Sequence, residues 1–391
     1  MHKFIYPFTL VSTISQFLII YYASLISIYQ VGIFSLLNSI FIIIISSARF
    51  DGAFLYISKL ISREDLENWS KNANGIVTIL FTITNLILIN NLNFIALSLI
   101  TLNFLNLYIG WSIDLKNPEK RLISGYNYIY KKDILINQIF FRFTLQIALL
   151  IIFLNSEKLS YETFNLYLKL IIFLEFIILY SISFYKIGIK INFKKNGFPP
   201  AKYFMNILLR KGEESMLNLS IAFISGINTL GSIQLGLSFS RILKLFINQL
   251  LRFEYVNLYS KKFLKKILNL SLLSYLLYLL FPVVLILINR NFNFINYKID
   301  TLIFILLCIY SGNRNSKNII QHLGIVFKEI NIVIKFSINL ILINFFISFI
   351  IMILKNYFIL SLSQILFILI SADTIYTLSK LLNNYKLKNS S

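Results

Sequence analysis

Two long stretches without any charged residue constrain this chain more than any other feature. No charge occurs from Phe4 to Ala48, and none from Asn72 to Ser112. A helix that crosses a bilayer needs about 20 apolar residues, so each stretch is too long for one spanning helix and suits two. We expect the first stretch to divide near Gly32 and the second near Asn90 and Asn91.

Further apolar segments follow along the chain and predict single spans. They lie near 134–154, 164–185, 214–232, 236–258, 267–289, 299–314, 331–353 and 357–379. The pattern predicts an all-α polytopic membrane protein with about twelve transmembrane helices. The tenth span is the weakest, because only Thr301 to Asn313 is free of charge.

The composition excludes several classes of protein. Hydrophobic residues make up 57% of the chain and charged residues 14%, whereas a soluble protein carries about a quarter charged residues. One cysteine and two histidines argue against disulfides, thiolate clusters and histidine chemistry. We find no phosphate-binding glycine loop and no nucleophile–base pair. We therefore expect no catalytic residue, no cofactor and no metal site.

The positive charge indicates a membrane orientation. The formal net charge is +21, but the cations flank apolar runs, so we expect membrane lipids as partners and no nucleic acid. With the N-terminus inside, one set of loops and termini holds 26 cations and the opposite set 4. Because short basic loops stay in the cytoplasm, both termini are predicted to be cytoplasmic. The short outer loops leave no room for the outer domain of a polysaccharide polymerase or ligase.

A weak internal repeat suggests two similar halves. At an offset of 203 positions, segments Arg49–Lys59 and Arg252–Lys262 share Arg, Phe, an acid, Leu, Tyr and Lys. Such a duplication gives lobes related by a pseudo-two-fold axis along the membrane normal. We predict a six-helix lobe over 1–190, a basic cytoplasmic connector over 191–213 and a second six-helix lobe over 214–391. Chance coincidence in a chain rich in Phe, Tyr and Leu is the alternative.

Cations inside the predicted spans are candidates for substrate binding, because an ionisable residue in a bilayer is costly. In the eighth span several polar residues share one helical face at spacings of three and four. Gln138, Arg142 and Gln146 form a similar stripe in the fifth span. Arg49 and Arg252 lie near cytoplasmic ends, where they can also snorkel to the interface. The candidate substrate-binding residues are Arg142, Arg241, Lys244, Arg49, Arg252, Asn38 and Asn248.

Two interpretations of these cations remain open. They form either a structural network of buried ion pairs or the wall of a positively charged cavity. The cavity predicts an anionic substrate, since the planar guanidinium group of arginine suits phosphate. The acids available inside the spans are Glu175 and Asp373. Both are candidates for ion coupling.

Short motifs in both halves resemble a known family. Val31–Leu36 followed by Ala48–Ala53 resembles the second-span signature of the O-antigen and capsule flippases. Gly197–Pro200 looks like their Phe-Pro motif, and Gly236–Leu243 is similar to their eighth span. These flippases belong to the multidrug/oligosaccharidyl-lipid/polysaccharide exporter (MOP) superfamily, whose members have twelve or more helices in two lobes.

The resemblance implies a flippase in the bacterial inner membrane. Such a protein moves an undecaprenyl-diphosphate-linked oligosaccharide from the inner to the outer leaflet by alternating access. Its implied partners are that lipid-linked substrate, a polysaccharide polymerase and a chain-length regulator. From the family's residues we carry over only Arg49 and Arg241. A drug or small-molecule antiporter of the same superfamily is the alternative, and it would want an acidic cavity.

Overall fold

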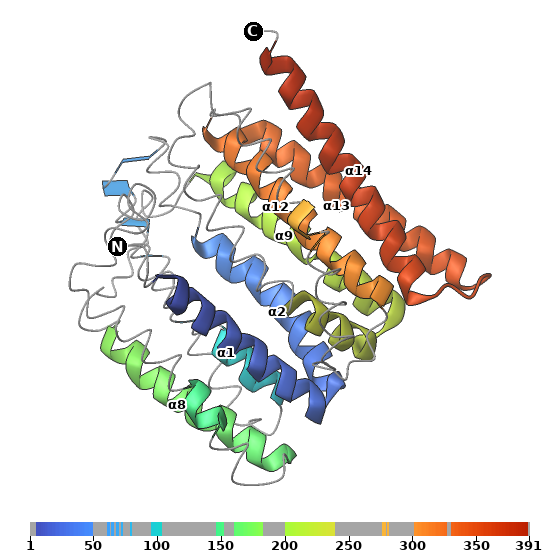
Figure 1. The fold of residues 1–391 in the computed structure, drawn as a ribbon. Coiled ribbons are helices and arrows are strands. Elements are labelled where there is room, and N and C mark those ends of the chain that lie inside the picture. The colour runs from blue at the N-terminus through green and yellow to red at the C-terminus, as the bar shows by residue number, and fades with distance from the viewer. Residues whose placement is uncertain are drawn as a thin grey trace. The chain divides into compact units, whose positions relative to one another are not determined.

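The computed structural model divides the chain into two compact units, Met1–Leu208 and Leu209–Ser391. The structure describes residues 5–49, 61–62, 64–65, 68–69, 72, 79, 95–103, 146–151, 160–182, 200–238, 276–278, 280, 301–326 and 330–389. Every regular element among these residues is a helix (Figure 1). The all-α prediction is confirmed for this part of the chain. The total of twelve helices stays a prediction.

The first unit begins with two helices separated by a single residue. These are α1 (Ile5–Ile26) and α2 (Ile28–Arg49), and α8 (Tyr161–Ile182) follows later. The predicted division at Gly32 is wrong, because the chain turns at Ser27 and Gly32 lies inside α2. The reason is a helix cap: the Ser27 hydroxyl oxygen accepts a hydrogen bond from the backbone N–H of Gln30.

The second unit contains most of α9 (Ala201–Ser225) and a helical stretch over 227–238. It ends with α12 (Thr301–Val326), α13 (Ile330–Lys355) and α14 (Leu362–Asn389). The last three helices pack against one another and are joined by short connections (Figure 1). Ser361 and Gln364 form a reciprocal cap at the start of α14. The side chain of each residue accepts a hydrogen bond from the backbone N–H of the other.

Two predicted spans have different bounds in the structure. The seventh, expected over 214–232, is α9 over Ala201–Ser225, and the tenth, expected over 299–314, extends to Val326 in α12. Both were misplaced because charged residues lie inside these helices and end the apolar pattern. The segment 191–213, expected to be a connector, is helical from Ala201 onward. The sixth, eleventh and twelfth spans match α8, α13 and α14 within a few residues at their starts.

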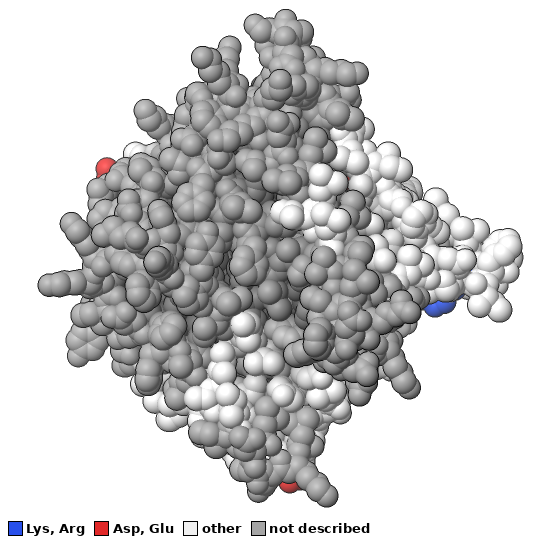
Figure 2. Space-filling model, in the orientation of Figure 1, with Lys and Arg blue, Asp and Glu red and all other residues white. Residues whose placement is uncertain are grey.

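The helix α13 exposes an apolar surface and buries polar side chains. Its most apolar 18 residues have a mean hydropathy of 2.5, and only 22% of this segment is buried. The polar residues Ser337, Asn344 and Ser348 face inward, while Phe345 and Phe349 are more than half exposed. Apolar groups outside and polar groups inside reverse the arrangement of a soluble protein. In the face drawn in Figure 2 the described surface is almost entirely uncharged.

Two helices pass the criteria of length and apolarity for a membrane span in the described part of the chain. They are α13 and the first part of α14, Leu362–Lys380. The helices α9 and α12 are not among them: α9 carries charged residues over Arg210–Glu214, and in α12 the shorter apolar stretch Leu302–Arg314 is followed by polar residues and Lys317. Their fold therefore depends on how those charges are paired.

A single glycine turns the chain between α9 and the next helix. Gly226 has φ of +88°, in the left-handed region that favours glycine. The ammonium group of Lys355 donates a 2.6 Å hydrogen bond to the carbonyl oxygen of Ile224, close to the C-terminus of α9. Ser27 and Gly226 are both one-residue breaks between two helices. The two-fold symmetry itself stays a prediction.

We expect Gly226→Ala to destabilise the protein by about 1–2 kcal/mol through backbone strain. An added Cβ meets no atom within 4 Å, so a steric clash makes no contribution. Thermal unfolding in detergent measures the effect. Gly226→Asn is the matched control, because asparagine tolerates positive φ and therefore destabilises less. Equal losses for the two variants would contradict the assignment to strain.

Candidate functional site

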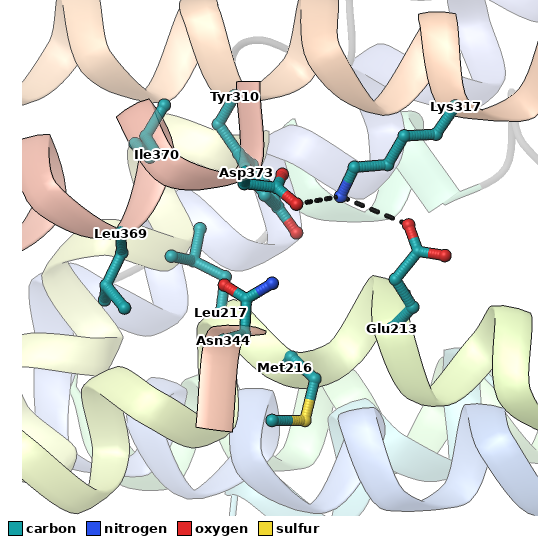
Figure 3. A pocket seen from close by; sticks show the side chains of 9 residues that line it. All are labelled: Glu213, Met216, Leu217, Tyr310, Lys317, Asn344, Leu369, Ile370 and Asp373. Atoms are coloured by element: carbon teal, nitrogen blue, oxygen red, sulfur yellow. Dashed lines mark ion pairs between the residues drawn. The ribbon is translucent and has the colours of Figure 1, made fainter. Parts of the chain in front are cut away.

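A buried lysine in α12 lies between two carboxylates that come from different helices. Lys317 Nζ is 3.1 Å from Glu213 Oε1 of α9 and 2.6 Å from Asp373 Oδ1 of α14 (Figure 3). All three side chains are almost completely buried. One ammonium group therefore joins three helices of the second unit.

The two neighbouring amides of α12 hold the outer oxygens of the same carboxylates. Asn313 Nδ2 donates to Asp373 Oδ2 at 2.6 Å, and Gln321 Nε2 donates to Glu213 Oε2 at 3.1 Å. Asn313, Lys317 and Gln321 are spaced four residues apart, which places them on one face of the helix. Each carboxylate thus has one oxygen on the ammonium and one on an amide.

A second group of charges adjoins the first. Glu214 Oε2 is 2.7 Å from Lys211 Nζ and 2.6 Å from Arg314 Nη2, which links α9 to α12 again. The Tyr310 hydroxyl donates to the backbone oxygen of Glu214. We call the six charged groups of these two clusters the ion-pair network. They are Glu213, Glu214, Asp373, Lys211, Arg314 and Lys317.

The six groups of the ion-pair network are three carboxylates and three cations, and the buried Arg210 guanidinium lies beside Lys211 on α9. This pairing explains how α9 and α12 carry buried charges, since such charges persist only when they are paired and hydrogen-bonded. Removing one partner of a buried pair is strongly destabilising, because it leaves an uncompensated charge. The network therefore fixes the packing of α9, α12 and α14.

The cavity beside Lys317 is too small for a substrate. It offers about 10 Å³ to water, which is roughly the room for one water molecule. Polar groups line one side, and Met216, Leu217, Leu369 and Ile370 line the other (Figure 3).

The structure places three of the residues singled out in the sequence. Asp373, expected as an ion-coupling acid, is held by Lys317 and Asn313. Asn38 is buried in the first unit, where its Oδ1 accepts a hydrogen bond from Asn103. The side-chain oxygen of Gln146 accepts a hydrogen bond from the Ser15 hydroxyl. Asn38 and Gln146 therefore contact other helices.

The remaining candidates cannot be placed in the same way. Arg142, Arg241, Lys244, Asn248 and Arg252 lie outside the described residues, and so do the side chains of Arg49 and Glu175. Their roles in substrate binding and ion coupling stay predictions.

Most of the ion-pair network is absent from the predictions made on the sequence. Hydropathy places Lys211, Arg314 and Lys317 in cytoplasmic loops and gives Glu213 and Glu214 no role. Two signals were nevertheless present. Asn313, Lys317 and Gln321 recur every four residues, and charges of both signs adjoin the apolar part of α9. Mixed charges at helical spacing indicate paired groups on a helix face better than a loop.

Comparison with known proteins identifies the fold. No protein-family model and no curated protein matches the chain by sequence. Among solved structures, an inward-facing multidrug resistance MATE family transporter of the MOP superfamily matches with a TM-score of 0.59. Its identity is 14%, over 98% of this chain and 95% of that one. The chain has the fold of MOP-superfamily transporters.

Two further solved structures agree with this assignment. A MATE protein in complex with MaL6 matches with a TM-score of 0.54 and 13% identity, over 98% of this chain and 94% of that one. A MOP superfamily transporter from Pyrococcus furiosus matches with a TM-score of 0.50 and 12% identity. The match covers 98% of this chain and 96% of that one. That transporter is described as having a binding pocket of reverse polarity, which suggests a different function for it. At such identities the likeness extends to the MOP fold alone.

We expect Lys317→Met to destabilise the protein by about 3–5 kcal/mol, because two buried carboxylates lose their common cation. Thermal unfolding in detergent without sodium measures the loss. Lys335→Met is the matched control, since Lys335 is exposed on α13 and surface substitutions change stability by less than about 0.5 kcal/mol. A Lys317 variant as stable as the control would show that the ion-pair network does not hold the helices.

Proposed function

We propose that this chain is a membrane transporter that works by alternating access. The observation that carries the proposal is the likeness to MOP transporters over 98% of the chain. The lipid-facing surface of α13 and the buried charges of α9 and α12 support it, because both features belong to a protein that functions within a bilayer. The predicted cytoplasmic termini and paired lobes are part of this proposal.

The substrate that we propose is an oligosaccharide linked to undecaprenyl diphosphate, moved between the leaflets of a bacterial inner membrane. The support comes from the sequence. Arg142, Arg241 and Lys244 lie deep in predicted spans, and cations in a poorly hydrated cavity favour a diphosphate. The flippase-like motifs around Arg49 and Arg241 point the same way. A polymerase and a chain-length regulator are the proposed protein partners.

A drug or small-molecule antiporter is the second candidate. The structural match with the highest TM-score given above is a multidrug resistance transporter, and this observation favours it. The ion-pair network does not discriminate between the two candidates, because its six charges cancel. The decision rests on the cations of the predicted fifth and eighth spans.

The double variant Arg241→Ala, Lys244→Ala tests the flippase. We expect it to abolish the flipping of a fluorescent undecaprenyl-diphosphate oligosaccharide in proteoliposomes, because both cations that bind the diphosphate are lost. Lys335→Ala is the matched control and should flip at the wild-type rate. Wild-type flipping by the double variant would contradict a cationic binding site.

The same proteoliposomes separate the two candidates. A flippase moves the lipid-linked substrate and leaves amphiphilic drug cations untouched, whereas an antiporter exports those cations down an imposed gradient of protons or sodium. Drug export without flipping by the wild-type protein would replace the first candidate with the second.

Glu175 is the remaining acid that we propose for ion coupling, since Asp373 already has a cation and an amide. We expect Glu175→Gln to slow flipping and to weaken its dependence on a proton gradient, without reducing insertion into the membrane. Flipping rates measured across a range of pH provide the test. Unchanged rates at every pH would remove Glu175 from the mechanism.

A further inference from the structure

The geometry around Lys317 is that of a cation site whose occupant is part of the chain. Glu213 Oε1 and Asp373 Oδ1 converge on a single point from opposite helices, and the ammonium group lies at that point. The side chains of the two acids are 1% and 3% exposed, and that of the lysine is 6% exposed. Carboxylates so deeply buried need a cation between them.

The two carboxylates are oriented without the help of the lysine. Asn313 holds the far oxygen of Asp373, and Gln321 holds the far oxygen of Glu213. Gln321 is itself positioned by a contact of 3.3 Å with the Ser337 hydroxyl of α13. If the ammonium group were removed, these amides would still direct the inner oxygens at the empty point. Such preorganisation is typical of a coordination site.

Further polar groups and some free space lie next to the same point. Tyr310 and Asn344 line the water-sized cavity together with both acids and the lysine (Figure 3). A small cation placed there would have the two carboxylates and one water within reach. Oxygen ligands of this kind suit hard cations.

We infer that this is a site for one small monovalent cation, filled permanently by the ammonium group of Lys317. The native protein therefore takes no sodium ion at this point. A neutral side chain at position 317 opens the site to Na⁺ or to a proton. One consequence of this inference rests on the proposed transport function: if an ion drives transport, that ion binds elsewhere in the chain.

The local charges support both parts of this inference, namely that the native protein binds no further cation here and that a neutral side chain at position 317 opens the site. Two carboxylates and one ammonium sum to −1, and the adjoining group of Glu214, Lys211 and Arg314 sums to +1. A further cation would bring an uncompensated positive charge next to a site that already adjoins Arg210, Lys211, Arg314 and Lys317, which is costly. Without Lys317 the point carries two negative charges that only a bound cation or a proton can neutralise.

The groups that face the site from each packed helix are few. On α9 they are Arg210, Lys211, Glu213 and Glu214, and on α12 they are Tyr310, Arg314 and Lys317. On α14 Asp373 faces the site, and α13 contributes Ser337 and Asn344, neither of which titrates near neutral pH.

The experiment compares the thermal unfolding of purified full-length variants in detergent. Lys317→Met is the test variant, because its side chain is neutral and reaches about as far as the lysine Cε. Each protein is measured at mildly alkaline pH in NaCl, KCl, LiCl and choline chloride at equal ionic strength. We expect the wild-type midpoint to be the same in all four salts.

We expect the midpoint of Lys317→Met to rise by several degrees in NaCl or LiCl over choline chloride, because a ligand that binds only the folded state stabilises it. Lowering the pH in choline chloride should raise it as well. The double variant Lys317→Met, Asp373→Asn should lose the response to salt. Lys335→Met should behave like the wild type.

Two results would overturn the inference. One is a wild-type protein stabilised by Na⁺ or Li⁺ over choline, which would show a cation bound beside Lys317. The other is a Lys317→Met protein that responds no more than the wild type, or that fails to fold in NaCl as well as in choline chloride. The measurement needs no transport, so a failure of flipping leaves its outcome intact.

Discussion

The pairing of one buried ammonium group with two buried carboxylates is the constraint on which the second unit depends. Charges in a bilayer are tolerated only when they neutralise one another and find hydrogen bonds. Lys317 contacts acids from α9 and α14, and the amides beside it on α12 complete the bonding of both. Three helices are thereby held in one register, since sliding any of them would strand a charge in an apolar environment.

The same pairing separates structural charge from functional charge in this molecule. Lys211 and Arg314 share Glu214, and Lys317 contacts Glu213 and Asp373, so each of these three cations is already paired with a carboxylate. A substrate with a diphosphate group would therefore be bound by cations outside this network, such as those of the predicted fifth and eighth spans. The site in the second unit contributes rigidity and, in our interpretation, excludes inorganic cations from one position.

Hydropathy predicted the all-α class and located α13, because α13 is apolar along nearly its whole length. It failed for α9 and α12, where charges such as Arg210 and Lys317 interrupt the apolar pattern. Their neutralisation depends on acids that are distant in the sequence: Asp373 lies in another helix, and no local pattern joins it to Lys317. The one-residue turn at Ser27 was missed for a related reason, since a serine cap is a weaker signal than a glycine. The spacing of Asn313, Lys317 and Gln321 was the one clue to the site within a single helix.

A double-mutant cycle between Glu213 and Lys317 tests the central claim most directly. The free energy of unfolding is measured for the wild type, Glu213→Gln, Lys317→Met and the double variant, all in choline chloride so that no inorganic cation fills the site. The account predicts a coupling energy of about 1–3 kcal/mol, because groups in direct contact are not additive. Additive losses would contradict it, since they would mean that the two side chains do not meet inside the folded protein.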